Sequence, residues 1–366
     1  MHASHSAAVA SSHVRVPDVR YTAAPTPTVP TPTAPTVLNP TAPAVEVLGL
    51  EPLDARTIIT EALVTQAGCA VRLLPAPVFD ALSRFCTDPG PAGALLLRDV
   101  PIGDLPSTPP TPHAANNSGK SLTSELSLLT VARALGQPVG YLPEHGGDVV
   151  QNIVPVQASQ HRQVSTSSRV QLMFHTEAAF HPHRPRYLLL LCLRGDPSAA
   201  TTLSSVRDVL PHLDPDVVDV LFQPRFQTRP DESYLSAHVV GGGVGGGVSP
   251  GVSGGVGSLG HPMSVLTGHR ETPSLVFDAD LMVGIDPVAQ AALESFAAAV
   301  AAHHTSVVLE AGDMLIIDNT VAVHGRSPFT PRFDGTDRWL QRTFVVADLM
   351  PSAVERVGRI IATSFN

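Results

Sequence analysis

The sequence is poor in cysteine, carries no excess of basic residues and contains no long apolar run. Its three cysteines, Cys69, Cys86 and Cys192, are odd in number and lack C-x-x-C spacing, which argues against a disulfide scaffold and against a thiolate zinc site. The net charge of -9 offers no basic face to a nucleic acid and no polybasic patch to a membrane, so neither is expected as a partner. The longest apolar run, Tyr187 to Leu193, is far shorter than the roughly 20 residues that span a bilayer.

The N-terminus also lacks the basic stretch followed by an apolar stretch that marks a secretory signal peptide. Cytoplasmic residence is therefore the expectation. The chain has 366 residues, of which 43% are hydrophobic and 15% charged, as is typical of a globular protein, and its 35 Pro and 28 Gly indicate long loops.

Two segments of biased composition set the predicted domain boundaries. Residues 1–45 consist mainly of Ala, Thr, Pro and Ser, and such a segment cannot bury enough apolar surface to offset its ordering entropy, so we expect a disordered tail. Residues 46–366 are expected to form a single domain. Within it, residues 239–259 are rich in Gly, and the sequence is compatible both with a flexible bulge and with a lid over an active site.

Apolar periodicity predicts many short strands with a few helices, most of them in the first third of the chain. This pattern favours a mainly β fold with flanking helices, whose core is a double-sheet jelly roll, that is, a cupin-like double-stranded β-helix with a pocket between its sheets. A helical segment is expected after the last strand. Helices are predicted at Leu50–Ala67, Pro75–Phe85, Leu122–Leu135, Asp214–Phe222 and Pro287–His304, and strands at Gly93–Val100, Val149–Val156, Arg186–Asp196, Ala200–Val206, Ser306–Leu309, Asp313–Ile317 and Arg338–Asp348.

The strongest chemical signal is the segment FHTEAAF, read together with DNTVAVHGR about 150 residues later. His175 and Glu177 stand two apart, so in an extended segment their side chains project from the same face. His324 can complete a set of two imidazoles and one carboxylate, the facial triad that suits a non-haem Fe(II) oxygenase. A chance match is the alternative for the H-x-E triplet alone, since the chain contains 16 His.

An Fe(II) ion with three protein ligands keeps positions free for a chelating 2-oxo acid and for O2. The protein must then supply a cation for the far carboxylate of the 2-oxo acid, and arginine suits this best because its planar fork holds a carboxylate through two hydrogen bonds. Arg338 and Arg342 stand four apart in a predicted strand, so both project from one face. Surface ion pairing is the alternative for each.

Three ordered blocks carry a family resemblance that spans about Leu122 to Asp348. They resemble the clavaminate synthase-like branch of the Fe(II)/2-oxoglutarate oxygenases, within the TauD/TfdA-like superfamily, and more closely the bacterial arginine and asparagine β-hydroxylases of non-ribosomal peptide pathways. The blocks are VSTSSRVQLMFHTEAAFHPHRPRYLLLLCLRGD, LFQPRFQTRPDESYL and DNTVAVHGRSPFTPRFDGTDRWLQR.

The resemblance implies a role for each matching position. A free amino acid is a zwitterion, and a desolvated pocket must supply a partner for each of its charges. Glu144 lies at a turn beside two glycines, where a solvated loop carboxylate is the alternative. The implied residues are His175, Glu177 and His324 for Fe(II), Arg338 and Thr201 for the 5-carboxylate of 2-oxoglutarate, Arg342 and Ser165 for the substrate's α-carboxylate, Glu144 for its α-ammonium group, and Asp231 and Asp278 for its side chain.

The predicted function is therefore hydroxylation of an unactivated carbon, Cβ, of a free L-amino acid, with Fe(II), 2-oxoglutarate and O2. Asp278 suits a guanidinium or a carboxamide, and Asp231 alongside it favours arginine, whereas Glu144 also occurs in asparagine-type relatives. Glu177 argues against a halogenase, because halogenases of this superfamily lack that carboxylate. The alternatives are another amino acid, a carrier-tethered aminoacyl group, and a non-catalytic jelly roll that binds a metal.

Overall fold

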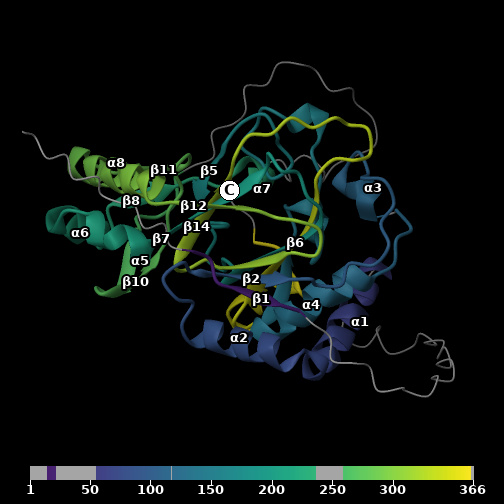
Figure 1. The fold of residues 1–366 in the computed structure, drawn as a ribbon. Helices are drawn as coiled ribbons and strands as arrows, with labels where there is room; N and C mark the ends of the chain where they lie inside the picture. Colours follow the sequence, from purple (N-terminus) through teal and green to yellow (C-terminus); the bar gives the residue numbers. More distant parts are fainter. Residues whose placement is uncertain (1–14, 22–54, 117, 236–258, 364–366) are drawn as a thin grey trace, which may run out of the picture.

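The structure is a computed structural model that describes residues 15–21, 55–116, 118–235 and 259–363 (Figure 1). Their largest element is a nine-stranded sheet centred on the Leu-rich strand β6 (Tyr187–Arg194). β6 is buried on both faces, which explains why its apolar run is continuous and does not alternate. In sheet order the strands are β1 (Asp18–Arg20), β2 (Ala94–Arg98), β13 (Met314–Asp318), β6, β15 (Trp339–Val346), β3 (Gln137–Tyr141), β17 (Ile360–Ile361) and β16 (Arg356–Val357), and β4 (Gln151–Ile153) pairs with β15 beside this path.

A four-stranded sheet faces the large one and carries both histidines of the predicted metal motif. Two two-stranded sheets lie beside it, and all the pairings within these units are antiparallel. The four-stranded sheet has the order β12 (Thr305–Val308), β7 (Ala200–Ser205), β14 (Ala322–Arg326) and β5 (Leu172–His175), and the two-stranded sheets are the hairpin β9 (Leu266–His269) with β10 (Thr272–Leu275) and the pair β8 (Phe226–Thr228) with β11 (Met282–Gly284).

Most of the helices cover the outer faces of the two sheets (Figure 1). Helices α1, α2 and α4 pack under the large sheet, and α5, α6 and α8 lie beside the four-stranded sheet and the two-stranded sheets. The described helices are α1 (Ala55–Ala70), α2 (Ala76–Thr87), α3 (Pro112–Asn116), α4 (Thr123–Leu135), α5 (Val206–Val209), α6 (Pro215–Leu221), α7 (Glu232–Leu235) and α8 (Pro287–Ala302).

Apolar cores lie between the two sheets and outside each of them, and the alternation of β14 shows how they relate. Ala322 packs between the two sheets together with Leu203 of β7, whereas Val323 packs outward against the core under α8. Because successive side chains of a strand point to opposite faces, His324 returns to the space between the sheets. The fold thus directs the distal histidine inward.

The predicted helices and strands all appear, with boundaries shifted by a few residues, but both ends of the chain differ from expectation. Asp18–Arg20, inside the segment predicted to be a disordered tail, forms β1 and pairs in parallel with β2, because the edge of β2 offers free backbone groups. The other residues of 1–45, and residues 239–258 of the Gly-rich insertion, lie outside the described residues.

The prediction of a helix after the last strand is wrong. A short 3-10 turn, Met350–Ser352, leads instead into the β16–β17 hairpin. β17 then pairs in parallel with β3, where Leu142 N donates to Ile361 O at 2.8 Å. The segment is extended because β3 has an open edge whose backbone groups need hydrogen-bond partners. The sequence analysis did not predict β3 as a strand, so it could not predict this pairing.

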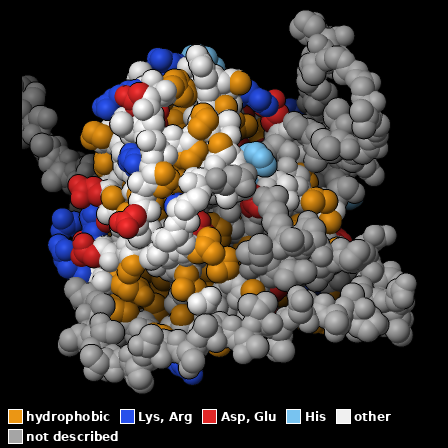
Figure 2. Space-filling model, turned by 90° about the vertical axis from the view of Figure 1, so that its right-hand side faces the viewer, with side chains coloured by type: hydrophobic (Ala, Val, Ile, Leu, Met, Phe, Trp, Pro, Cys, Tyr) orange, Lys and Arg blue, Asp and Glu red, His pale blue; other side chains and the backbone are white. Residues whose placement is uncertain are grey.

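Among the described residues, no single helix is long and apolar enough to cross a bilayer. The segments Thr60–Leu73 and Ala76–Thr87 meet that test of length and composition only when taken together, and they are bent by 109°. On the face drawn in Figure 2, acidic and basic side chains are interspersed among apolar ones.

Candidate metal centre and substrate cavity

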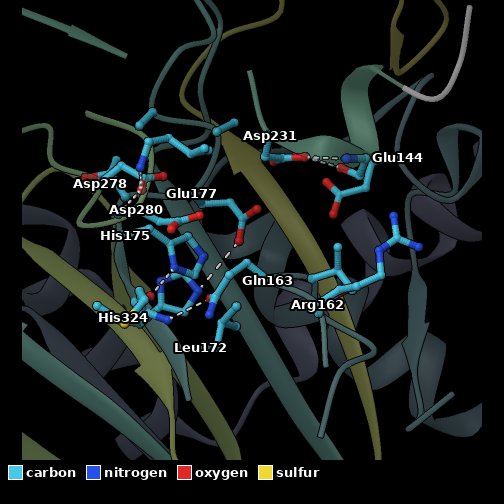
Figure 3. Close-up of a pocket in the computed structure, with 18 of the residues that line it drawn as sticks. Glu144, Arg162, Gln163, Leu172, His175, Glu177, Asp231, Asp278, Asp280 and His324 are labelled. Atoms are coloured by element: carbon cyan, nitrogen blue, oxygen red, sulfur yellow. Dashed lines mark hydrogen bonds and ion pairs between the residues drawn. The ribbon is translucent and has the colours of Figure 1, made fainter. Parts of the chain in front are cut away.

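The two strands that carry the predicted histidines pair with each other. β5 and β14 are antiparallel with His175 opposite His324, and Glu177 follows just beyond the end of β5. Ligand atoms from these three side chains all lie within 4.8 Å of one another (Figure 3). The imidazole centroids are 4.3 Å apart, and His324 Nε2 lies 3.6 Å from Glu177 Oε2. The predicted triad is therefore assembled as a compact set of donors.

Hydrogen bonds orient this set from behind. His175 Nδ1 donates to the Met173 carbonyl at 2.8 Å, which leaves Nε2 as the nitrogen available to a metal. Asn319, in the turn before β14, accepts from Glu177 N at 2.8 Å and donates to Glu177 O at 3.1 Å. The backbone of the carboxylate ligand is thus clamped by a side chain from the β13–β14 turn.

The electrostatics of the triad suit a divalent cation. Burial raises the pKa of Glu177 to about 7, against the lowering effect of the Arg342 guanidinium. Burial, together with the neighbouring His175 and Arg342, holds the pKa of His324 well below its usual value, so its imidazole is neutral. Two imidazoles and a buried carboxylate form a donor set that fits Fe(II), because a cation stabilises the ionised carboxylate.

Arg338 lies between the sheets. This agrees with the prediction that its side chain projects from the same face of the strand as that of Arg342. Its side chain is 7% exposed, and in the part of the chain that the structure describes it has no hydrogen bond or ion pair. The Phe329 ring lies 6.0 Å from its guanidinium carbon, and burial lowers its pKa. A buried cation without a partner is costly, so this position fits an anionic group such as the carboxylate of a 2-oxo acid.

Thr201, the predicted neighbour of Arg338, is buried on β7 opposite Arg326 of β14. The Arg326 guanidinium also packs on Phe329, at 5.1 Å, and burial together with the Arg338 charge lowers its pKa to about 9. Arg326 thus connects Thr201 with Arg338, although neither of these two lines the cavity described next.

Arg342 is paired within the protein. Its Nε and Nη2 donate to Gln151 Oε1 at 2.8 and 2.6 Å, Nη2 also bonds to Glu144, and Nη1 lies 3.4 Å from Glu177 Oε2. Burial alone would lower its pKa, but the carboxylates of Glu144 and Glu177 outweigh burial and raise it. Arg342 therefore connects Glu144, the predicted partner of the substrate's α-ammonium group, with Glu177, the carboxylate of the predicted metal triad.

A cavity of about 290 Å³ opens beside the triad. Every residue predicted for the site lines it except Arg338 and Thr201. Glu144 Oε2 is buried there and has no hydrogen-bond partner among the described residues. The predicted residues that line the cavity are Glu144, Ser165, His175, Glu177, Asp231, Asp278, His324 and Arg342.

The two aspartates predicted to lie alongside each other occupy different sides of the cavity (Figure 3). The backbone of Asp278 forms an isolated antiparallel β-bridge with that of His175, and Asp278 lies close to Asp280. Asp231 lies beside Glu144 instead, and the Glu144 charge adds to burial in raising the pKa of Asp231. Burial also raises the pKa of Asp278. The expectation failed because α7 and the β10–β11 loop approach the cavity from opposite sides, which sequence order does not reveal.

Comparison with known proteins decides the family. The model of the taurine catabolism dioxygenase TauD, TfdA family matches residues 93–344, which is more than half of the chain. The chain belongs to the TauD/TfdA dioxygenase family. It is a 2-oxoglutarate-dependent dioxygenase that uses Fe(II) and O2, so the predicted resemblance, enzyme class and cofactors are confirmed.

Several relatives of this dioxygenase match most of its length. It is 39% identical over 289 residues to an L-asparagine oxygenase of Streptomyces coelicolor, covering 77% of this chain and 79% of the relative. It is 37% identical over 305 residues to an L-lysine 3-hydroxylase of Catenulispora acidiphila, covering 82% and 81%. A solved asparagine oxygenase in complex with Fe(II), 2S,3S-3-hydroxyasparagine and succinate has a TM-score of 0.71 and 34% identity, covering 85% of this chain and 98% of that one.

The structure of this dioxygenase also contains site residues that the sequence analysis missed. Gln151 holds Arg342, Asn319 holds the backbone of Glu177, and Arg326 lies beside Arg338. Asn319 and Arg326 flank His324 in the DNTVAVHGR segment, so their closeness to a predicted ligand could have marked them as site residues. Their contacts, however, are made to residues about 140 to 160 positions away, which the sequence does not reveal. Gln151 carried no signal of its own.

Proposed function

We propose that this dioxygenase hydroxylates an unactivated carbon, Cβ, of a free L-amino acid. The observation that carries the proposal is the buried Glu144–Arg342 pair, which opens into the same cavity as the triad. An anion and a cation at one end of a cavity match the two charged groups of an amino acid. An α-ammonium group would satisfy the unpartnered Glu144 Oε2, and relatives named for asparagine and lysine support this substrate class.

Each site residue then has a proposed role. Bound Fe(II), with 2-oxoglutarate and O2, supplies the oxidation, and the chain's own residues bind, orient and exclude water. The roles proposed are His175, Glu177 and His324 as Fe(II) ligands, Arg338 and Thr201 as partners of the 2-oxoglutarate 5-carboxylate, Arg342 and Ser165 as partners of the substrate α-carboxylate, Glu144 as partner of the α-ammonium group, and Asp231 and Asp278 as further acidic groups around the substrate.

A carrier-tethered substrate is the alternative within the same chemistry. A thioester has no free carboxylate for Arg342. Arg342 is already paired with Glu144 and Glu177, so a thioester would not leave it as an unpaired buried cation, and Arg342 does not discriminate between the two substrates. The free amino acid is favoured instead by the relatives, which are named for L-asparagine and L-lysine, and by the solved asparagine oxygenase, whose complex contains 2S,3S-3-hydroxyasparagine.

The acidic groups favour a substrate with a cationic side chain. Asp278 Oδ1 accepts hydrogen bonds from Asp280 N and Leu281 N, which leaves Oδ2 for a ligand, and Asp280 also lines the cavity. This acidic pair lies on the far side of His175 from Glu144 (Figure 3). A side chain that runs from the Glu144 end past the metal ligands would bring a guanidinium or ammonium group to it, so arginine, lysine or ornithine is favoured over asparagine.

The test is incubation of the enzyme with Fe(II), 2-oxoglutarate and each common L-amino acid, plus L-ornithine, followed by mass spectrometry. We expect the gain of one oxygen atom and succinate release that rises with a basic amino acid. If no free amino acid gains oxygen or stimulates succinate release, the proposal is wrong.

The variant Asp278→Asn tests whether Asp278 recognises the side chain of the substrate. We expect kcat/KM for the basic substrate to fall by about 100-fold, because a desolvated charge pair is lost, while 2-oxoglutarate turnover without substrate is retained. The matched control is Asp219→Asn, an aspartate in an exposed ion pair on α6, which should change neither. An unchanged order of preference among amino acids in Asp278→Asn would contradict the assignment.

We also propose that the two facing sheets form a double-stranded β-helix and that residues 46–366, joined by β1 from the preceding segment, are one domain. The shared apolar core between the sheets and the inward-facing triad support this architecture. A crystal structure with strand order different from the one described would overturn it.

A further inference from the structure

Tyr234 of the short helix α7 is buried in a group of aromatic rings beside the cavity. Its side chain is 3% exposed. Its ring centroid lies 4.8 Å from that of Phe180 at 79°, 6.1 Å from that of His181, and 6.0 Å from that of Tyr141. Edge-to-face packing, as between Tyr234 and Phe180, stabilises a ring pair beyond the area that it buries.

These rings belong to the segments that carry the carboxylates of the cavity. Phe180 and His181 follow the metal-binding Glu177 by three and four residues. Tyr141 ends β3, and its carbonyl accepts from Glu144 N at 2.9 Å. Tyr234 itself stands three residues after Asp231 and donates its backbone N–H to Asp231 O at 3.1 Å. One side chain thus connects the three segments that present Glu144, Glu177 and Asp231.

An ion pair between Glu232 and Arg162 attaches α7 to the loop that carries Ser165 and lines the cavity. Arg162 Nη2 lies 2.5 Å from Glu232 Oε1, and Arg162 Nε donates to Glu232 Oε2 at 3.0 Å. Arg162 belongs to the loop that also carries Ser165 and lines the cavity. Both side chains are about half exposed, at 47% and 53%, so the pair adds orientation more than stability.

The docked position of α7 brings two carboxylates together. Asp231 Oδ1 is held by Ser233 N and Ser233 Oγ, at 2.8 and 2.5 Å, so Oδ2 remains for a ligand. Asp231 lies beside Glu144, whose Oε2 has no partner in the described part of the chain (Figure 3). Like charges in a desolvated place repel, and a cation between them removes that repulsion.

We propose that Tyr234 is a positioning residue which, with the Arg162–Glu232 ion pair, docks α7 so that Asp231 faces Glu144, and that the α-ammonium group of the substrate stabilises this docking. The inference rests on the proposed function, because it needs an amino acid in the cavity. It assigns α7 a part in substrate binding and none in binding 2-oxoglutarate, since Arg338 lies apart from it.

Hydrogen exchange of the full-length Fe(II) enzyme under anaerobic conditions tests the coupling to substrate directly. The backbone N–H groups of Ser233 and Tyr234 bond to Asp231, so they report docking. We expect saturating L-arginine, with L-lysine and L-ornithine in parallel, to slow their exchange by about tenfold, while succinate alone does not. Unchanged exchange with an amino acid that the same enzyme hydroxylates would overturn the inference and leave the proposed function intact. If none of the three is hydroxylated, the same exchange measurement is made with the amino acid that does gain oxygen, and if no free amino acid gains oxygen it is the proposed function that fails.

Kinetics of Tyr234 variants separate positioning from a loss of stability. Tyr234→Ala should raise KM for the amino acid about tenfold and change KM for 2-oxoglutarate less than about twofold, and Tyr234→Phe, which keeps the ring, should stay within about threefold of wild type. The matched control is Phe85→Ala, a buried aromatic on α2 in the core under the large sheet, which should lower Tm without changing either KM. Equal effects of Tyr234→Ala and Phe85→Ala on the amino-acid KM would overturn the assignment.

A charge swap tests the ion pair. Arg162→Glu and Glu232→Arg should each raise the amino-acid KM about threefold, and the double variant should restore it. A double variant no better than the worse single one would remove the ion pair from the proposal.

Discussion

Arg338 and Arg342 are both buried arginines on one face of β15 and its N-terminal flank, but their surroundings differ. Arg342 has Glu144, Glu177 and Gln151 as partners, whereas Arg338 has no ion pair in the described part of the chain. A buried cation without a partner is costly, so Arg338 is a site for an anion that the described part of the chain does not supply. Arg342 already has carboxylate partners, so a substrate carboxylate would join an existing charge network there, whereas at Arg338 an anion would supply the missing partner.

Arg338→Met should accordingly stabilise the protein while it disables the enzyme. Removing an unpaired buried charge should raise Tm by about 2 °C or more, and KM for 2-oxoglutarate should rise by at least about tenfold. Adding 2-oxoglutarate should raise the Tm of the wild type but not of the variant, as measured by differential scanning calorimetry. A variant that is several degrees less stable than wild type would show that Arg338 has a structural partner.

The buried His181 should make stability depend on pH. Burial, and then the neighbouring His183, lower its pKa from 6.5 to about 3, so the folded protein keeps it neutral. The contribution of His181 to the free energy of unfolding is complete above pH 6.5 and is lost as the pH falls toward 3. Over this range the unfolded chain binds a proton at His181 and the folded chain does not, so at pH 5 the loss is about 2 kcal/mol.

His181→Asn removes this titration and keeps an acceptor for the hydrogen bond that His183 N donates to His181 Nδ1. The fall in Tm between pH 8 and pH 5 should therefore be smaller in the variant than in the wild type, measured in the same buffers. An equal fall would mean that His181 is not the group responsible.

Among the secondary-structure elements, β3 and its turn position Glu144. A Cβ on Gly140 would lie 2.3 Å from the Gly147 carbonyl oxygen, and Gly147 N in turn donates to Glu144 O at 3.0 Å. The close approach of β3 to this turn requires glycine at position 140, and it fixes where the Glu144 carboxylate enters the cavity.

Gly140→Ala should therefore displace the turn and raise the amino-acid KM by about tenfold, with a loss of stability of about 2 kcal/mol or more. The matched control is Gly268→Ala in the β9–β10 hairpin, where φ is +84° and no atom lies within 4 Å of the added Cβ. That variant should lose about 1 kcal/mol through backbone strain and leave KM unchanged. A similar KM for both variants would contradict the role of β3.

For the whole molecule, the strand near the N-terminus belongs to the fold. Val19 and Tyr21 pack against the core under the large sheet, and Tyr21 N donates to Arg98 O at 2.7 Å. A chain that starts at Arg15 should keep the Tm of the full protein, whereas one that starts at Glu46 should lose about 5 °C, because an edge strand and two apolar side chains are removed. Equal Tm values would show that β1 adds nothing to the folded protein.

The sequence by itself determined the local parts of this protein. The two-residue spacing of His175 and Glu177, the alternation of the strand with Arg338 and Arg342, and the Leu-rich run of β6 are periodicities within one segment, so they could be interpreted without coordinates. The family resemblance then extended these parts to a dioxygenase, which the comparisons confirm.

Only the tertiary structure decided which groups share an environment. It placed Asp231 beside Glu144 and away from Asp278, gave Arg342 ion pairs and Arg338 none within the described ranges, and brought Asn319 and Tyr234 to the segment that follows His175. These contacts join residues that are tens to about two hundred positions apart, and they depend on how loops and sheet edges meet in space. No pattern along the chain encodes such meetings, because burial and charge pairing arise only when the layers pack.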